Sequence, residues 1–165
     1  MKRILFLAVF FLTVTGVNAQ GFKQAAGIRA GWINPGIEYR YYTGETHALR
    51  ALLSVRDRGV QLHALSEFYQ YDLFPFSYQL VFFYGAGVHF GFQSWDETTF
   101  QGSTRFDETR RSLLAGIDGV VGVEYLFYEA PVKVGLEVKP YLDVFGRYGF
   151  DVRLPDFALT VKYLF

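Results

Sequence analysis

The sequence contains no cysteine, and it has only one methionine and two tryptophans among 165 residues. Without cysteine, the chain can hold neither a disulfide framework nor a thiol nucleophile. Long apolar runs are also scarce. After the one near the N-terminus, no segment of the sequence resembles a transmembrane helix. An excess of one charge is absent as well, since 16 Lys and Arg accompany 16 Asp and Glu. A nucleic-acid partner is therefore not expected.

The first 19 residues have the features of a secretory signal peptide. Lys2 and Arg3 precede an apolar run over residues 4–14, and the small-residue segment Val17-Asn18-Ala19 fits a cleavage site. An uncleaved membrane anchor is the alternative, but the run is shorter than the about 20 apolar residues that a spanning helix needs. We expect residues 1–19 to be removed and residues 20–165 to form one domain.

What the sequence does contain is an abundance of aromatic residues, 19% of the total, together with 17 glycines. Apolar and polar residues alternate in eight segments, which is the period of a β-strand and not of a helix. Turn-forming groups such as Asn34-Pro35-Gly36 and Asp57-Arg58-Gly59 separate the segments. The pattern predicts an all-β domain of eight antiparallel strands, over residues 20–32, 37–42, 49–56, 60–69, 78–92, 113–127, 132–143 and 157–165.

The two faces of these segments differ in chemistry. One face is apolar and aromatic, too bulky for the interior of an eight-stranded barrel, which side chains just fill. We expect this face to contact lipid, where a charge at the midplane would cost about 2–4 kcal/mol, and the polar face to line the lumen. The predicted lumenal charge network is Arg29, Glu38, Arg40, Arg50, Glu67, Asp118, Glu124, Glu137 and Lys139. Five further charges share its parity: Lys23, Arg56, Lys133, Asp143 and Lys162.

Aromatic residues gather at the two ends of the predicted strands, on either side of an aliphatic band. Such girdles are typical of outer-membrane barrels, whereas a soluble lipocalin-like barrel, the alternative, would have its aliphatic residues inside. The predicted girdle residues are Trp32, Tyr39, Tyr41, Tyr78, Phe90, Phe92, Tyr125, Phe127, Tyr163 and Phe165. The last segment, FALTVKYLF, alternates up to the terminal residue. Its exposed backbone edge would invite aggregation unless it pairs with the first strand and closes the barrel.

Several segments carry a resemblance to a known family. The C-terminal ALTVKYLF, with a final Phe and an aromatic residue two positions earlier, resembles the signal by which barrel-insertion machinery recognises outer-membrane proteins. FYGAGVHFGF, GIDGVVGVEYLF and APVKVGLEVKPYLDVF are similar to segments of small eight-stranded, OmpX-like outer-membrane barrels of Gram-negative bacteria, most without assigned function. The resemblance covers residues 27–165. It implies an up-and-down transmembrane barrel, contact with outer-membrane lipid and insertion through the C-terminal strand, but no activity.

The sequence predicts a packed polar lumen instead of an open channel, because eight strands leave no room for one. We expect a monomer that is not an enzyme, with no cofactor and no metal. A lipid-modifying enzyme is the alternative, and its candidate groups are His47, Ser54, His63, Ser66, Glu67, His89 and Asp118. His63 and Ser66 have opposite parity and point to opposite sides of the wall. His89 reaches Ser54 or Asp118 only in a register that the sequence does not fix, so no catalytic triad is predicted.

The segment over residues 95–111, WDETTFQGSTRFDETRR, is the one long polar insertion. Asp96-Glu97 and Asp107-Glu108 offer the oxygen ligands that Ca²⁺ prefers, but their spacing lacks an EF-hand pattern, and solvated charges are the better interpretation. We expect a loop here. Because loops on rigid scaffolds often carry recognition, this loop is the candidate site for a surface partner or lipopolysaccharide.

Overall fold

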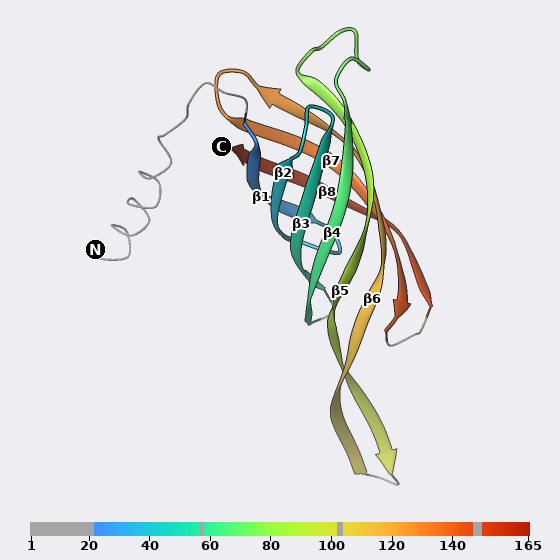
Figure 1. Ribbon diagram of the computed structural model, residues 1–165. Coiled ribbons are helices and arrows are strands. Elements are labelled where there is room, and N and C mark those ends of the chain that lie inside the picture. The colour runs from blue at the N-terminus through green and yellow to red at the C-terminus, as the bar shows by residue number, and fades with distance from the viewer. Residues whose placement is uncertain (1–21, 57, 102–103, 147–149) are drawn as a thin grey trace, which may run out of the picture.

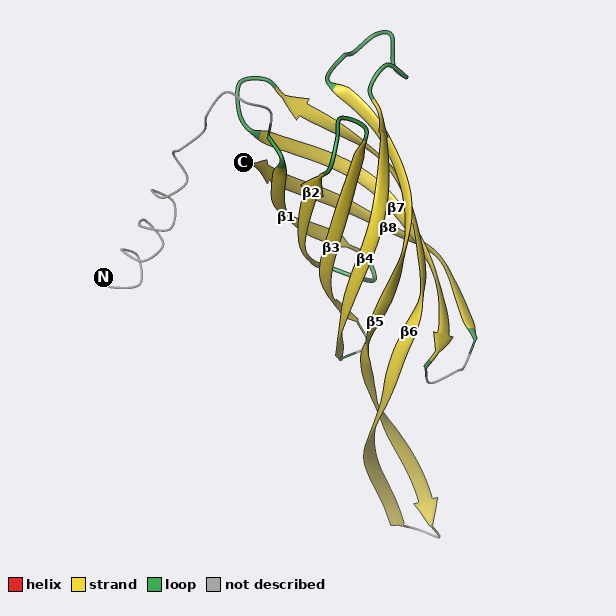
Figure 2. Cartoon of the chain, in the orientation of Figure 1, coloured by secondary structure: helices red, strands yellow, loops and turns green. Residues whose placement is uncertain are grey.

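The computed structural model describes residues 22–56, 58–101, 104–146 and 150–165, without the side chains at 98–101, 104–108, 153 and 154. The described chain forms strands and the turns between them (Figure 2). No described segment forms a helix of the length and hydrophobicity that crossing a membrane requires. The expected signal peptide, residues 1–19, lies outside the described residues. The strands are β1 (Gln24–Gly31), β2 (Gly36–Tyr42), β3 (His47–Arg56), β4 (Gly59–Gln70), β5 (Leu80–Gln101), β6 (Thr104–Phe127), β7 (Val132–Phe145) and β8 (Asp151–Leu164).

The eight strands form a closed barrel in which every strand is antiparallel to its neighbours in chain order (Figure 1). β1 and β8 close it, in a register that runs from Ala25 opposite Leu164 to Gly31 opposite Ala158. At the very end of the chain, Phe165 exchanges two backbone hydrogen bonds with Gln24, of 2.9 and 3.0 Å. The predicted fold class and the predicted closure are therefore confirmed. Closure leaves the terminal strand without a free edge.

The barrel has two unlike ends. The terminal end carries the start of β1, the end of β8 and the turns after β2, β4 and β6, whereas the ribbon end carries the turns after β1, β3, β5 and β7. At the ribbon end, β5 and β6 continue together far beyond the other strands (Figure 1). In this extension Ser94 pairs with Arg111 and Gln101 pairs with Thr104. We call residues 94–101 with 104–111 the ribbon.

The ribbon corrects the prediction of a loop over residues 95–111. Its described side chains, at 94–97 and 109–111, are all at least partly exposed, and the alternation of apolar and polar residues that identified the other strands is absent here. The sequence between the two strands is Gly102-Ser103, a dipeptide that favours a two-residue hairpin turn. That dipeptide was the one local signal of a hairpin.

The outer surface of the wall is aliphatic all the way round. Each of the eight strands contributes at least one aliphatic side chain that is 44% or more exposed, and together these form a closed belt. The belt residues are Ile28, Ile37, Leu53, Leu62, Val88, Ile117, Leu136 and Leu159. Along β3, exposed side chains alternate strictly with buried ones, so the residues on either side of each outward-facing residue point inward.

The predicted start of the last strand is wrong. The sequence predicts that it begins at residue 157, but β8 begins at Asp151. Pro155 of β8 lies with Pro140 of β7 where the β7–β8 register shifts between Lys139 and Tyr141. Proline lacks the N–H that a ladder needs and is tolerated in sheets at such irregularities. The shift lets both strands continue.

Candidate functional site

The barrel interior holds a dense set of charges. Among the described residues, seven Lys or Arg side chains and seven Asp or Glu side chains are buried inside, so these two sets balance each other when all are ionised. The nine residues of the predicted lumenal network all lie there, none more than 4% exposed. Two changes produce the balance: Lys23 is exposed outside β1 and was wrongly placed in the lumen, while Asp156, which was not predicted, is fully buried. Mutual pairing is what makes burial of so many charges tolerable.

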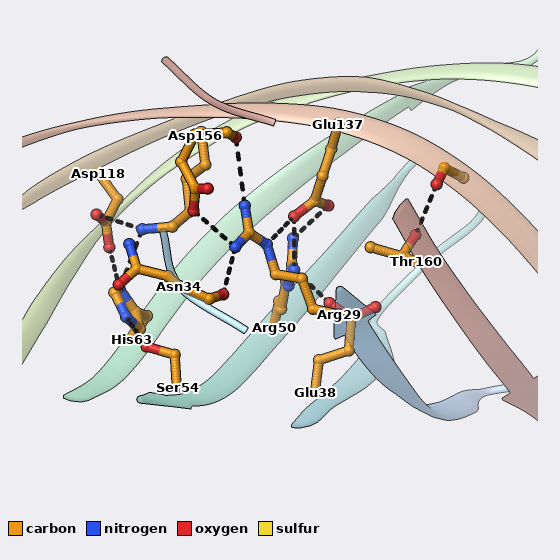
Figure 3. Close-up of polar contacts among 12 residues, drawn as sticks. Arg29, Asn34, Glu38, Arg50, Ser54, His63, Asp118, Glu137, Asp156 and Thr160 are labelled. Carbon is orange, nitrogen blue, oxygen red and sulfur yellow. Dashed lines mark hydrogen bonds and ion pairs between the residues drawn. The ribbon is translucent and has the colours of Figure 1, made fainter. Parts of the chain in front are cut away.

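Glu137 lies at the centre of the network (Figure 3). Its Oε1 accepts a hydrogen bond of 2.5 Å from Arg29 Nε and one of 3.0 Å from Arg50 Nη2, and its Oε2 accepts one of 2.9 Å from Arg50 Nη1. Arg40 Nη2 lies 3.6 Å from the same carboxylate. Arg29 is bound on its other side by Asp156, at 2.8 Å. One carboxylate from β7 thus ties β1, β2 and β3 together across the lumen.

A second group of charges lies closer to the terminal end. Glu124 accepts from Arg40 and, at 2.5 Å, from Lys162 Nζ. The guanidinium of Arg40 also lies 5.0 Å from the ring centre of Phe83. The interior also holds an apolar cluster, which the prediction of a packed polar lumen missed. Its members are Ala48, Leu65, Tyr69, Val81, Phe83 and Val120.

A third group lies toward the ribbon end and centres on Asp118. Its carboxylate lies 2.7 Å from His63 Nδ1, 3.0 Å from His89 Nδ1 and 2.8 Å from Lys139 Nζ. Because a carboxylate can only accept, the proton of His63 is on Nδ1, and its Nε2 accepts from Ser54 Oγ at 2.9 Å. Ser54, His63 and Asp118 therefore have the connectivity of a catalytic triad (Figure 3), although the sequence analysis predicted none.

The register of the β3–β4 hairpin could have revealed this chain of contacts. Arg56 pairs with Gly59 across a two-residue turn in which Arg58 has a φ of 53°, the left-handed backbone that such turns require. Counting back from that turn puts Ser54 opposite Gln61 and diagonal to His63. Diagonal cross-strand neighbours are within reach of long side chains.

Burial makes this triad a poor catalyst. Ser54 has no exposed surface and His63 is 1% exposed, so a substrate has no path to the hydroxyl group. His89 is also held in place: its Nε2 lies 2.9 Å from Asp143, and a Cβ at Gly116 would come within 2.6 Å of its ring. The group is packed like the rest of the interior.

The same residues have the composition of a metal site. Ligand atoms of His63, His89 and Asp118 lie within 4.8 Å of one another. Lys139 already binds the carboxylate at 2.8 Å, and both ring nitrogens of His89 lie against carboxylates, so a divalent cation would have to displace an ammonium group and a ring proton. Imidazole and carboxylate suit several transition metals, but the ammonium fits the charge better here.

The ten predicted girdle residues lie at the two rims of the outer wall or in the adjoining turn. Trp32, Phe90 and Phe92 are at the ribbon end, with exposed fractions of 91%, 59% and 47%. At the terminal end, Tyr125 and Tyr163 are half-buried and the others are exposed: Tyr39, Tyr41, Tyr78, Phe127 and Phe165. Neighbouring rings contact one another, as in the Tyr125–Phe127 pair with centroids 4.9 Å apart.

No protein-family model matches the sequence. No curated protein matches it either. Solved structures do resemble the fold. The chain superimposes on the N-terminal β-barrel domain of Pseudomonas aeruginosa OprF with a TM-score of 0.52 and 12% identity, over 88% of this chain and 100% of that one. Neisserial surface protein A (NspA) matches with a TM-score of 0.55 and 12% identity, over 86% of this chain and 94% of that one. At such identity the likeness establishes the fold alone: a small eight-stranded barrel.

Proposed function

We propose that the protein is an integral outer-membrane β-barrel of a Gram-negative bacterium, exported with a cleaved signal peptide, whose interior is structural and whose ribbon serves surface interaction. The observation that carries the proposal is the inverted distribution of side chains. Aliphatic residues face outward from all eight strands, while seven bases and seven acids among the described residues lie inside. Soluble monomers rarely expose contiguous apolar patches larger than a few hundred Å². A continuous belt is instead suited to lipid.

The lipocalin-like alternative needs the opposite arrangement. A soluble barrel of that kind would place the aliphatic residues inside, whereas here side chains such as Ile37 and Leu136 are 60% and 62% exposed. The proposed membrane orientation follows from the aromatic rims, which flank the aliphatic belt as interfacial girdles do. With the terminal end in the periplasm, the ribbon extends outward from the cell.

The interior supports a structural role for the lumen. Glu137, Asp118 and Glu124 each bind side chains from more than one other strand, so the carboxylates brace the wall from within. An eight-stranded barrel filled in this way contains no aqueous channel of the porin kind. We assign the protein neither conduction nor catalysis through the lumen.

The ribbon is the proposed surface for a partner outside the cell. The β4–β5 register ends at Gly91, and the β6–β7 register ends at Ala115. Beyond these residues, in the described part of the chain, the registers pair β5 and β6 only with each other, which leaves two outer strand edges. Such edges bind extended peptides by strand addition. This observation favours a peptide-like partner over lipopolysaccharide.

Cell fractionation tests the proposed function. When the full chain is expressed in a Gram-negative host, we expect it in the outer-membrane fraction at the mass of residues 20–165. The unheated protein should migrate faster on a gel than the boiled protein, because a hydrogen-bonded closed barrel stays compact in detergent. Recovery as a soluble periplasmic monomer would overturn the proposal.

A further inference from the structure

A second hydroxyl–imidazole pair lies on the outside of the wall, at the terminal end. His47 opens β3, and its Nε2 lies 2.8 Å from Ser66 Oγ of β4. Its Nδ1 lies 2.5 Å from Thr43 Oγ1 in the turn before β3. His47 and Ser66 are both partly exposed, in contrast to the sealed Ser54 inside the barrel. A hydroxyl group here is open to whatever surrounds the wall.

Local hydrogen bonds orient His47. The Thr43 N–H donates to the backbone carbonyl oxygen of His47 at 3.0 Å, and the Thr43 hydroxyl lies 3.3 Å from the same oxygen. When that hydroxyl donates to the carbonyl oxygen, its own oxygen accepts from the Nδ1–H of the imidazole, and the lone pair of Nε2 faces Ser66 Oγ. Nucleophile, base and orienting group are in the order that acyl-transfer enzymes use.

The position along the wall identifies the substrate, on the premise of the proposed membrane location. His47 pairs with Phe68 and Ser66 pairs with Leu49, so Ser66 lies one side-chain step inside the aromatic rim. The Phe68 ring contacts the rings of His47 and Tyr84, with centroids 5.0 and 5.8 Å apart. Interfacial aromatic rings lie at headgroup level. One step inward, the wall meets the acyl esters of the periplasmic leaflet.

We propose that Ser66 is a lipid-facing nucleophile that cleaves the acyl ester of a glycerophospholipid, with His47 as general base. Ser66 Oγ forms a bond to the ester carbonyl carbon while its proton passes to His47 Nε2. The bond to the glycerol oxygen breaks, and that oxygen takes the proton from Nε2 and leaves as a lysophospholipid. Water then attacks the carbonyl carbon of the acyl-serine and gives a proton to His47 Nε2. The bond to Ser66 Oγ breaks, Oγ takes that proton back, and the fatty acid leaves. Thr43 is a positioning residue.

The turnover is slow, for two reasons visible in the wall. Thr43 is neutral and does not compensate the charge of an imidazolium as a carboxylate would. The backbone of Ser66 is paired with Leu49 on one side and Ala86 on the other, so the ladders occupy backbone donors that could otherwise stabilise an oxyanion. The measurement must therefore follow product over hours.

The test uses the refolded mature chain in vesicles of phosphatidylethanolamine and phosphatidylglycerol, with free fatty acid and lysophospholipid quantified by mass spectrometry. We expect equal amounts of both products, and a loss of about 10²-fold or more in rate for Ser66→Ala and for His47→Gln, the range for loss of a general base. Thr43→Val should lower the rate and Thr43→Ser should restore it. An alkyl fluorophosphonate should label Ser66 in the wild type.

Ser112→Ala is the matched control, because Ser112 lies outside the ribbon, has an exposed hydroxyl with a backbone acceptor, the Leu113 carbonyl, and should retain the wild-type rate. Product formation that persists in Ser66→Ala overturns the inference. So does a wild-type protein that folds into the vesicles, as judged by heat-modifiable migration, but releases no fatty acid; that result leaves the proposed function standing. A chain that does not enter the vesicles overturns both.

Discussion

Replacing Glu137 by Gln should lower the free energy of unfolding by about 3–5 kcal/mol, the cost of removing one partner from a buried ion pair. The substitution keeps the size of the side chain but removes the carboxylate that Arg29 and Arg50 contact at 2.5 and 2.9 Å. Both guanidinium groups then remain buried with an excess of positive charge. The measurement is urea unfolding of the barrel in phospholipid vesicles, followed by tryptophan fluorescence.

Glu97→Gln is the control for this prediction. Glu97 also pairs with an arginine, Arg110 at 2.6 Å, but the two side chains are 42% and 57% exposed. Exposed pairs contribute about 0–1 kcal/mol, so this variant should unfold almost like the wild type. If the two variants lose the same stability, the interior charges do not form the structural network described here.

Replacing Phe165 by Ala should remove most of the outer-membrane yield in cells and leave refolding from denaturant nearly normal. In the finished barrel the ring is one rim side chain, worth at most about 1.5–3 kcal/mol of burial, and the substitution keeps the two backbone bonds to Gln24. In the cell, the same ring is part of the C-terminal segment that resembles the insertion signal. The measurement compares outer-membrane yield with refolding yield in detergent.

Phe127→Ala provides a matched control at the same rim, because Phe127 and Phe165 are both 44% exposed. It should change both yields little. Equal losses for the two variants in cells would show that Phe165 is only a rim residue, and that the chain is not recognised through its C-terminal strand.

The alternation of residues predicted the wall of this protein because two solvents act on its two faces. Ile28 faces outward and Arg29 inward as their parity requires, and buried and exposed residues alternate in the same way along β3. In the ribbon, where the described side chains are all at least partly exposed, the alternation disappears and the prediction of a loop was wrong. The apolar cluster around Phe83 was missed for a related reason. The outward-facing residues are apolar whether the inward-facing ones are polar or not, so they do not indicate where the lumen is apolar.

Contacts between strands were harder to predict than the side of the wall on which a residue lies. Parity correctly separated His63 from Ser66, yet it did not show that His63 meets Ser54 and that Ser66 meets His47. Those contacts depend on register, which the two-residue turn at 57–58 fixes for β3 and β4. Asp156 was missed because the last strand is predicted to begin at residue 157, whereas a register shift allows β8 to include Pro155 and Asp156.

The most direct test of the account is quenching of the two tryptophans by lipid. Trp32 lies at the rim of the barrel and is 91% exposed, whereas Trp95 lies in the ribbon beyond that rim. Single-tryptophan variants, made by Trp95→Phe and Trp32→Phe, are refolded into vesicles that contain brominated phospholipid. We expect the bromine atoms to quench Trp32 strongly and Trp95 little, and acrylamide in the water to do the reverse. Equal quenching of both by acrylamide, with no effect of brominated lipid on Trp32, would contradict a barrel whose outer wall faces the membrane.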